Sequence, residues 1–582
     1  MEHILRYDPI GNKTLKWIFI IILIVITVFL RINSLNSITP GLNQDESAIG
    51  YNAYSILQTG KDEWGVVYPI YFRSFGDYKL PAYIYTTAIF VKYFGLNEYA
   101  VRAPSVIAGI ICVMVLFLLL LYWTHNYTFS YICAILLSIN PWHLQFSRAG
   151  FEVNFALTAV ICGIYLFIIG VDKKNIFFLA LSIIFFNVSL YSYNVTRLLA
   201  PLLFITLCFQ YRKKMISIHK ITLVILGFIF LATLVPFFIT FFSLSGVVSA
   251  KSSLITSADI LVKNLEMRSY LASVPSWYKA LFYNKYVFMI YQYIENIALL
   301  FSGSFFFVSG STSMIQGVGN VGTFYLFQLP LFIIGLTLFA SKKLHSIGYF
   351  FYWFIITCLI LALSKEVPHA TRGYFLVIPI TIFTASGLIY VYKYINNFKS
   401  RFVKTLFLIT LLCFIFYNVQ FYFSSYYYRF PKEHATAWEH DNKKLANYLK
   451  SIESKYKKII IDGKSNFIYT SYLFYTAYSP NDYLKSAEYY KDGLLDKAKS
   501  WGKYEVRDIN WQKEVLIPDA LYVVNPQNWP ANMAVEKYLY YPEREIVFAS
   551  NEEIIKMPLS DISWLTVNSN RVIREQQASL AK

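Results

Sequence analysis

The stretch LKWIFIIILIVITVFL, residues 15–30, is almost pure hydrocarbon and decides the class of fold. A helix needs about 20 apolar residues to cross a bilayer, and this run with its flanking residues reaches that length. Lys13 and Lys16 stand at its start, and no small-residue cleavage site follows it. The run therefore predicts a retained membrane anchor rather than a cleaved signal peptide.

The composition of the whole chain points the same way. Of its 582 residues, 56% are hydrophobic and 15% are charged, whereas an ordinary soluble protein has about 25% charged residues. We therefore predict an α-helical polytopic membrane protein with about 11 or more transmembrane helices. The expected spans are 15–32, 99–122, 128–142, 153–170, 175–190, 198–210, 220–243, 324–340, 346–363, 373–394 and 402–424.

Short basic loops predict how these spans are oriented. Lys and Arg collect in cytoplasmic loops, so a correct topology should place the basic loops on one side. With a cytoplasmic N-terminus and eleven spans, the basic loops 171–175, 211–220, 341–346 and 393–404 all become cytoplasmic. The loops 33–98 and 244–323 are then expected on the outer face.

The net charge of +18 is explained by the Lys and Arg residues that collect in these cytoplasmic loops. No basic groove or binding motif accompanies it, so nucleic acid is not an expected partner. All six cysteines fall in apolar segments, which predicts neither a disulfide framework nor a CxxC metal site.

The chain changes character after residue 424. YKKIIIDG (456–463) and DALYVVNP (519–526) are predicted strands, EREIVFAS (543–550) is a third candidate, and 440–455 is a predicted helix. We therefore expect two domains. A membrane domain covers 1–424, including both long outer loops, and a C-terminal extracytoplasmic α/β domain covers 425–582.

Charged side chains gather on the expected outer face. Loop 33–98 holds a helix-like stretch closed by Gly60, and it carries Asp45, Glu46, Asp77 and Lys79. Other outer segments supply His143, Arg148, Glu152, Asn194, Arg197, His369 and Arg372. For any one of them, there is a simpler explanation: a charged side chain at a helix end extends to the membrane–water interface. Together they predict transfer of a group from an anionic, lipid-borne donor, because carboxylates act as bases and cations bind phosphate.

Four stretches carry a family resemblance: GLNQDESAIGYNAY (41–54), FGDYKLPAYIY (75–85), SRAGFEVNFAL (147–157) and PHATRGYFLVIP (368–379). In this order, they resemble the GT-C glycosyltransferases, and more narrowly the protein O-mannosyltransferases and lipid A aminoarabinose transferases. The resemblance covers roughly residues 15–425. It implies a polyprenyl-phosphate-linked monosaccharide as donor, inversion at the anomeric carbon and an extracytoplasmic active site in the cell membrane.

The resemblance also implies roles for particular residues. Asp45 matches the acid proposed as general base, with Glu46 as a helper or a helix-start charge, and Lys79 matches the cation on the donor phosphate. Arg372 is placed where a second phosphate-facing cation is useful. Glu152 matches an acid that binds acceptor or sugar hydroxyls. Arg148, spaced i, i+4 from it, is expected to orient it by pairing on one helix. Asp77, Tyr78, Asn194, Arg197 and His369 complete the expected acceptor- or sugar-binding set.

The stretch DYKLP departs from the family pattern. Tyr78 stands where some relatives have an acid that belongs to a metal site, and Asp77 is one residue out of that register. No metal ligand is therefore assigned. A divalent ion is left open as a cofactor, held by Asp77 with His369 or His143.

Three other functions stay open. A lipid-linked saccharide flippase or transporter would place charges near the midplane, in paired halves or broken helices. An oligosaccharide ligase or polymerase would share the outer-face charges. A non-catalytic scaffold would leave these charges dispensable. The acceptor, whether a glycan, a lipid or a protein, is not specified by the sequence.

Overall fold

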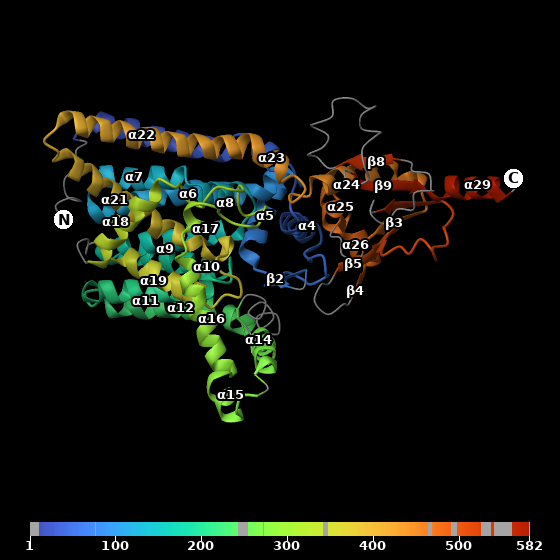
Figure 1. Ribbon diagram of the computed structural model, residues 1–582, viewed down its shortest axis with the longest axis horizontal. Coiled ribbons are helices and arrows are strands. Elements are labelled where there is room, and N and C mark those ends of the chain that lie inside the picture. Colours follow the sequence, from blue (N-terminus) through green and yellow to red (C-terminus); the bar gives the residue numbers. More distant parts are fainter. Residues whose placement is uncertain are drawn as a thin grey trace. The chain divides into compact units, whose positions relative to one another are not determined.

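The computed structural model describes residues 11–75, 77–241, 254–255, 257–271, 273–341, 347–463, 468–490, 497–524, 537–540 and 562–580. Helices dominate (Figure 1). The chain forms two compact units. We call Met1–Asn33 with Ser105–Ser425 the helical unit, and Ser34–Pro104 with Tyr426–Lys582 the α/β unit.

The helical unit contains ten of the eleven segments that were expected to span a membrane and most of the remaining one, 99–122. Each of the eleven expected segments overlaps one of its helices. Its helices are α2 (Lys13–Ile32), α6 (Glu98–Thr124, whose first residues belong to the α/β unit), α7 (Tyr127–Ser138), α8 (Pro141–Arg148), α9 (Glu152–Asp172), α10 (Ile176–Leu190), α11 (Thr196–Met215), α12 (Lys220–Phe241), α14 (Ser257–Tyr270), α15 (Ser276–Phe282), α16 (Lys285–Leu300), α17 (Ser304–Phe307), α18 (Gln328–Ala340), α19 (Tyr349–Leu361), α20 (Ala370–Gly373), α21 (Val377–Asn396) and α22 (Arg401–Ser424).

Five helical stretches of the described chain are long and apolar enough to cross a membrane: Lys13–Ile32, Glu98–Thr124, Glu152–Asp172, Ala370–Asn396 and Arg401–Glu433. The last of them has no buried residue in its apolar window. Phe402, Leu406 and Leu412 on it are all exposed, and so large an apolar surface is stable in hydrocarbon rather than in water. The chain is therefore an integral membrane protein, whereas the expected count of eleven spans is not confirmed.

The α/β unit joins the first long loop to the C-terminal region. Its loop part has α3 (Leu35–Ile38), α4 (Gln44–Thr59), β1 (Phe72–Ser74), β2 (Asp77–Lys79) and α5 (Pro81–Phe94). Its C-terminal part has α23 (Phe430–Glu433), α24 (His440–Ile452), β3 (Lys458–Asp462), α25 (Ile468–Tyr475), α26 (Pro480–Ser486), β4 (Glu488–Tyr490), β5 (Lys497–Trp501), β6 (Tyr504–Arg507), β7 (Ala520–Val524), β8 (Lys537–Tyr540), β9 (Ile562–Asn568) and α29 (Ser569–Leu580).

A seven-stranded mixed sheet organises the C-terminal part, in the order β4-β5-β6-β3-β7-β9-β8. The central strand β3 runs parallel to both β6 and β7. Because side chains alternate along a strand, Ile459 and Ile461 join the core that α24 and α25 cover, while Ile460 faces a second core that includes Val572 of α29. The predicted strands at 456–463 and 519–526 and the helix at 440–455 are confirmed. The third candidate, 543–550, lies outside the described residues.

The first long loop packs into the C-terminal region. Helix α4 lies so close to α25 that a Cβ atom at Gly50 would overlap the ring of Phe474. Tyr51 of α4 shares a buried core with Leu445 and Tyr472. Residues 34–104 thus form one compact unit with 426–582, whereas the sequence-based boundary grouped them with the membrane helices.

Candidate active site

The site is built around the first turn of α4. The side-chain oxygen of Asn43 accepts hydrogen bonds from the amides of Asp45 (2.9 Å) and Glu46 (3.0 Å), which caps the helix. Two carboxylates in this turn are favoured by the partial positive charge of the helix N-terminus. The cap therefore explains why adjacent acids are tolerated here and fixes the backbone that carries both.

Asp45 is paired with Lys79. The Lys79 ammonium donates to Asp45 Oδ1 at 2.7 Å. Lys79 lies on strand β2 of the β1–β2 hairpin, opposite Phe72. The Asp45 side chain is 56% exposed and that of Lys79 is 15% exposed. The carboxylate is therefore open to a ligand, and the cation beside it is largely shielded from water.

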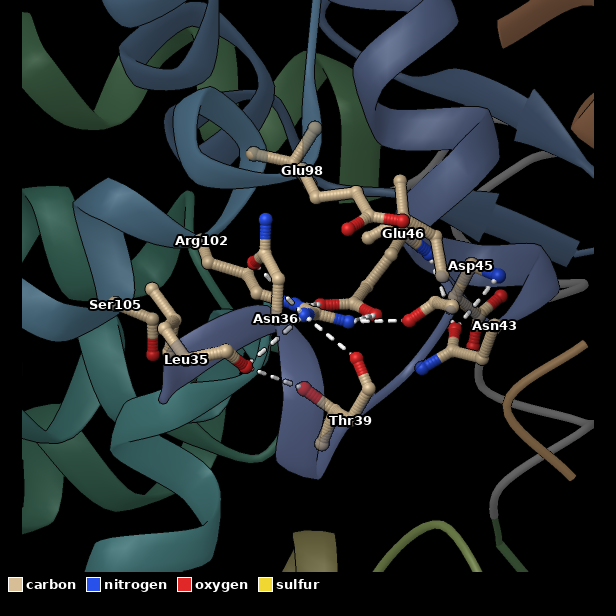
Figure 2. Close-up of polar contacts among 12 residues, drawn as sticks. Leu35, Asn36, Thr39, Asn43, Asp45, Glu46, Glu98, Arg102 and Ser105 are labelled. Carbon is tan, nitrogen blue, oxygen red and sulfur yellow. Dashed lines mark hydrogen bonds and ion pairs between the residues drawn. The ribbon is translucent and has the colours of Figure 1, made fainter. Parts of the chain in front are cut away.

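Glu46 has the opposite environment. Both of its oxygens bind Arg102 of α6, at 3.0 Å to Nε and 3.2 Å to Nη2, and both side chains are almost fully buried (Figure 2). The same guanidinium donates to the carbonyl oxygens of Leu35, Thr39 and Gly41 and to the side chain of Asn36. One buried Arg therefore ties α6 to α4 and to the loop that leads into it.

Glu98 links α6 to the C-terminal part of the α/β unit. Its Oε1 accepts from Lys443 of α24 and from the Tyr475 hydroxyl of α25, both at 2.8 Å. The oxygen of the same hydroxyl accepts from the Leu42 amide at 3.0 Å. The segment that leads into α4 is consequently held both by Arg102 and by the Glu98–Tyr475 pair.

A third carboxyl, Glu63, lies fully buried beyond the end of α4. Its Oε1 accepts from Asn52 at 3.1 Å, while Oε2 has no hydrogen-bond partner within the described chain. Burial raises the pKa of Glu63 to about 8, although the positive charge of Lys79 opposes this. Glu63 is therefore mainly protonated at neutral pH.

The other two residues of the hairpin motif contribute differently. Tyr78 pairs with Arg73 across the hairpin, and its ring meets that of Tyr71 edge-on at 6.1 Å between centres. The backbone of Asp77 pairs with Ser74, while the side chain of Asp77 lies outside the described part of the structure. A sugar-binding role for Tyr78 and Asp77 stays a prediction.

The expected Arg148–Glu152 arrangement on one helix is wrong. Arg148 ends α8 and Glu152 begins α9, with Ala149, Gly150 and Phe151 between the two helices. Arg148 is fully buried and donates to the backbone carbonyls of Leu30 and Asn33, the latter at 2.7 Å. The i, i+4 rule failed because it assumes one continuous helix.

His143 lies buried in the helical unit beside a cation that the sequence reasoning missed. Arg31 Nη2 is 2.7 Å from His143 Nδ1, and Arg31 also donates to the carbonyls of Thr27 and Ser138. Burial and the Arg31 charge hold the pKa of His143 well below its usual range. His143 is therefore a neutral acceptor for Arg31.

The remaining candidates lie at two short segments of the helical unit. Asn194 precedes α11, and Arg197 lies in its first turn. His369 accepts from or donates to the Thr371 hydroxyl at 2.9 Å, and burial together with the Arg372 charge lowers its pKa to about 4. Asn194 Oδ1 and Arg372 Nη1 are both buried and have no hydrogen-bond partner among the described residues.

Within the described ranges, no group of three or more His, Cys, Asp and Glu side chains is arranged to hold a metal ion. His143 and His369 belong to the helical unit and Asp77 to the α/β unit. The divalent-ion site considered from the sequence needs the side chain of Asp77, which lies outside the described residues, so this site stays a prediction.

Sequence reasoning missed Glu98, Arg102 and Arg31. The sequence did contain an indication of each: an ionised side chain at the end of an otherwise apolar helix requires a partner. Glu98 and Arg102 are i, i+4 on α6, yet each pairs with another element. The presence of a partner was thus predictable from the sequence, but its identity depends on the tertiary fold.

The chain was also compared with known proteins. No family model matches the sequence, and no curated protein matches it. Among solved structures, ArnT from Cupriavidus metallidurans in the apo state is similar at 12% identity, over 95% of this chain and 97% of that one, with a TM-score of 0.49. ArnT from the same organism bound to undecaprenyl phosphate is similar at 11% identity, over 96% and 98%, also with a TM-score of 0.49. We assign no residue role from this similarity.

Proposed function

We propose that the protein is an inverting glycosyltransferase that moves a monosaccharide from a polyprenyl-phosphate donor to an acceptor hydroxyl on the outer face of the membrane. One observation carries this proposal: an accessible carboxylate, Asp45, lies 2.7 Å from the shielded ammonium of Lys79. The donor class comes from the resemblance of the four sequence stretches.

The chemistry needs both charges. Asp45 accepts the proton of the acceptor hydroxyl as its oxygen attacks the anomeric carbon from the face opposite the leaving group. The C–O bond to the phosphate breaks, and the polyprenyl phosphate leaves with an added negative charge. Lys79 stabilises that charge as it develops, in a site where a shielded cation is worth more than in water.

The other residues receive supporting roles in this proposal. Glu46 is a positioning residue, because both of its oxygens already bind Arg102. Arg372, with a buried and unpartnered Nη1 among the described residues, is the second candidate for the donor phosphate. Asn194, Arg197, Glu152 and His369 remain candidates for sugar or acceptor hydroxyls.

Asp45→Asn tests the proposal. The amide keeps the shape of the side chain but cannot take a proton, so turnover should fall by about 10²–10⁴-fold, while yield and donor-lipid binding stay near wild type. Transfer is measured with purified enzyme and polyprenyl-phosphate sugars. Asp482→Asn, an exposed carboxylate on α26, is the matched control and should keep full activity. Wild-type turnover in Asp45→Asn would remove Asp45 as the base.

A further inference from the structure

Trp64 contacts the hairpin strand that lies opposite Lys79. Its indole Nε1 donates to the carbonyl oxygen of Arg73 at 3.0 Å, and the Arg73 guanidinium lies 4.4 Å from the centre of the indole ring. Arg73 follows Phe72 on β1, and Phe72 is paired with Lys79 on β2. A hydrogen bond and a cation–π contact therefore hold β1 to Trp64, one residue from the pair that includes Lys79.

Tyr489 of β4 holds Trp64 from the C-terminal part of the unit. The two ring centres are 3.9 Å apart, and the ring planes make an angle of 24° in a stacked arrangement. The Tyr489 hydroxyl also donates to the carbonyl oxygen of Glu63 at 2.7 Å. An edge strand of the seven-stranded sheet therefore fixes both the ring of Trp64 and the backbone just before it.

The backbone around Trp64 is also fixed to α4. Asn52 of α4 binds Glu63 twice, because its side-chain oxygen accepts from the Glu63 amide at 3.0 Å and its Nδ2 donates to Glu63 Oε1 at 3.1 Å. Asp62 Oδ1 accepts from the Trp64 amide at 2.9 Å. Asn52, Asp62 and Glu63 are all almost fully buried. Since α4 also carries Asp45, these bonds place Trp64 relative to that acid.

The 2.7 Å contact between Asp45 and Lys79 joins two separate elements, α4 and the hairpin. The ammonium of a lysine ends a flexible four-carbon stem, so its position is set by the backbone that carries it and by the groups around it. Trp64 is linked to α4 through the residue before it and to β1 through its indole. The arrangement of the two charges consequently depends on Trp64, and Tyr489 keeps Trp64 in place.

We propose that Trp64 and Tyr489 are positioning residues for Lys79, through which the C-terminal part of the α/β unit sets how tightly the donor phosphate is bound. This inference rests on the proposed function, in which Lys79 contacts that phosphate. Neither aromatic ring touches the donor. The C-terminal part thereby acts on the donor as well as in any choice of the acceptor.

Donor affinity tests the inference, measured by calorimetric titration of the detergent-solubilised protein with a polyprenyl phosphate. Tyr489→Leu should weaken binding by about tenfold, because Lys79 is displaced from its place beside Asp45. Tyr489→Phe keeps the stacked ring and should restore most of the affinity. Tyr490→Leu is the matched control on the same strand, since the Tyr490 hydroxyl donates to the Val506 carbonyl within the sheet. Wild-type affinity in Tyr489→Leu, or an equal loss in Tyr490→Leu, would overturn the inference.

A double-mutant cycle separates a positioning role from a general loss of structure. If Tyr489 acts through Lys79, Tyr489→Leu should cause no further loss of affinity once Lys79→Ala has removed the ammonium. Additive losses would mean that Tyr489 acts elsewhere and would contradict the inference. Wild-type affinity in Lys79→Ala alone would instead refute the phosphate contact of the proposed function, so the two failures are distinguishable.

Trp64→Phe covers the case in which Tyr489→Leu does not fold. Phenylalanine keeps a ring for Tyr489 to stack on but removes the hydrogen bond to the Arg73 carbonyl. Binding of the polyprenyl phosphate should weaken in this variant, and again not in the Lys79→Ala background. An affinity equal to that of the wild type would show that the indole does not position Lys79.

Discussion

Asp45 and Glu46 are neighbours in sequence and have opposite environments. Successive side chains on a helix point about 100° apart, because 3.6 residues make one turn. At the start of α4, this rotation turns Asp45 towards solvent and Lys79, and turns Glu46 inward to Arg102. The sequence predicted two acids at a helix start, but it could not tell the accessible acid from the buried one.

This difference predicts separate phenotypes for the two acids. Glu46→Gln leaves a buried Arg102 without its counter-charge, and breaking such a pair costs about 3–5 kcal/mol. The thermal unfolding temperature of the detergent-solubilised protein should fall clearly, while Asp45→Asn should unfold near the wild-type temperature. A Glu46→Gln protein as stable as wild type would show that the pair does not hold α4 to α6.

At the scale of elements, local sequence patterns predicted the helices and strands well, but they did not predict which elements contact each other. Helix α4 with its closing Gly60, helix α24, and strands β3 and β7 are where the sequence placed them. The break between α8 and α9 was missed, because the charge spacing around it suits one continuous helix. The pairing of Glu98 with α24 and α25 could not be predicted from a local pattern either, since these partners are more than 300 residues away in the sequence.

The contact of residues 438–440 with the turn before α4 predicts the effect of Gly41→Ala. The added methyl group would meet the Trp438 carbonyl, which is backbone and cannot rotate away. We expect turnover to fall at least tenfold, with donor-lipid binding less affected, because a displacement of Asp45 misaligns the base. Gly227→Ala, where a Cβ meets nothing within 4 Å, is the control. Equal activity of both variants would show that this contact does not position Asp45.

At the scale of the whole molecule, hydropathy predicted an integral membrane protein and the helices that compose it. All eleven expected segments fall on helices, yet five stretches of the described chain meet the length and composition of a span. Hydropathy also could not assign residues 34–104 to a unit with 426–582. Their burial comes from tertiary packing of α4 on α25, and no local pattern in the sequence encodes that partner.

The central claim is that the chain uses a polyprenyl-phosphate donor held by Lys79. It is tested most directly by mass spectrometry of the lipids that copurify with the wild-type protein and with Lys79→Ala. We predict a polyprenyl phosphate or its monosaccharide ester on the wild type and its loss in Lys79→Ala, because the shielded ammonium beside Asp45 is the proposed phosphate contact. No polyprenyl species on the wild type, even after one is added, would contradict the account.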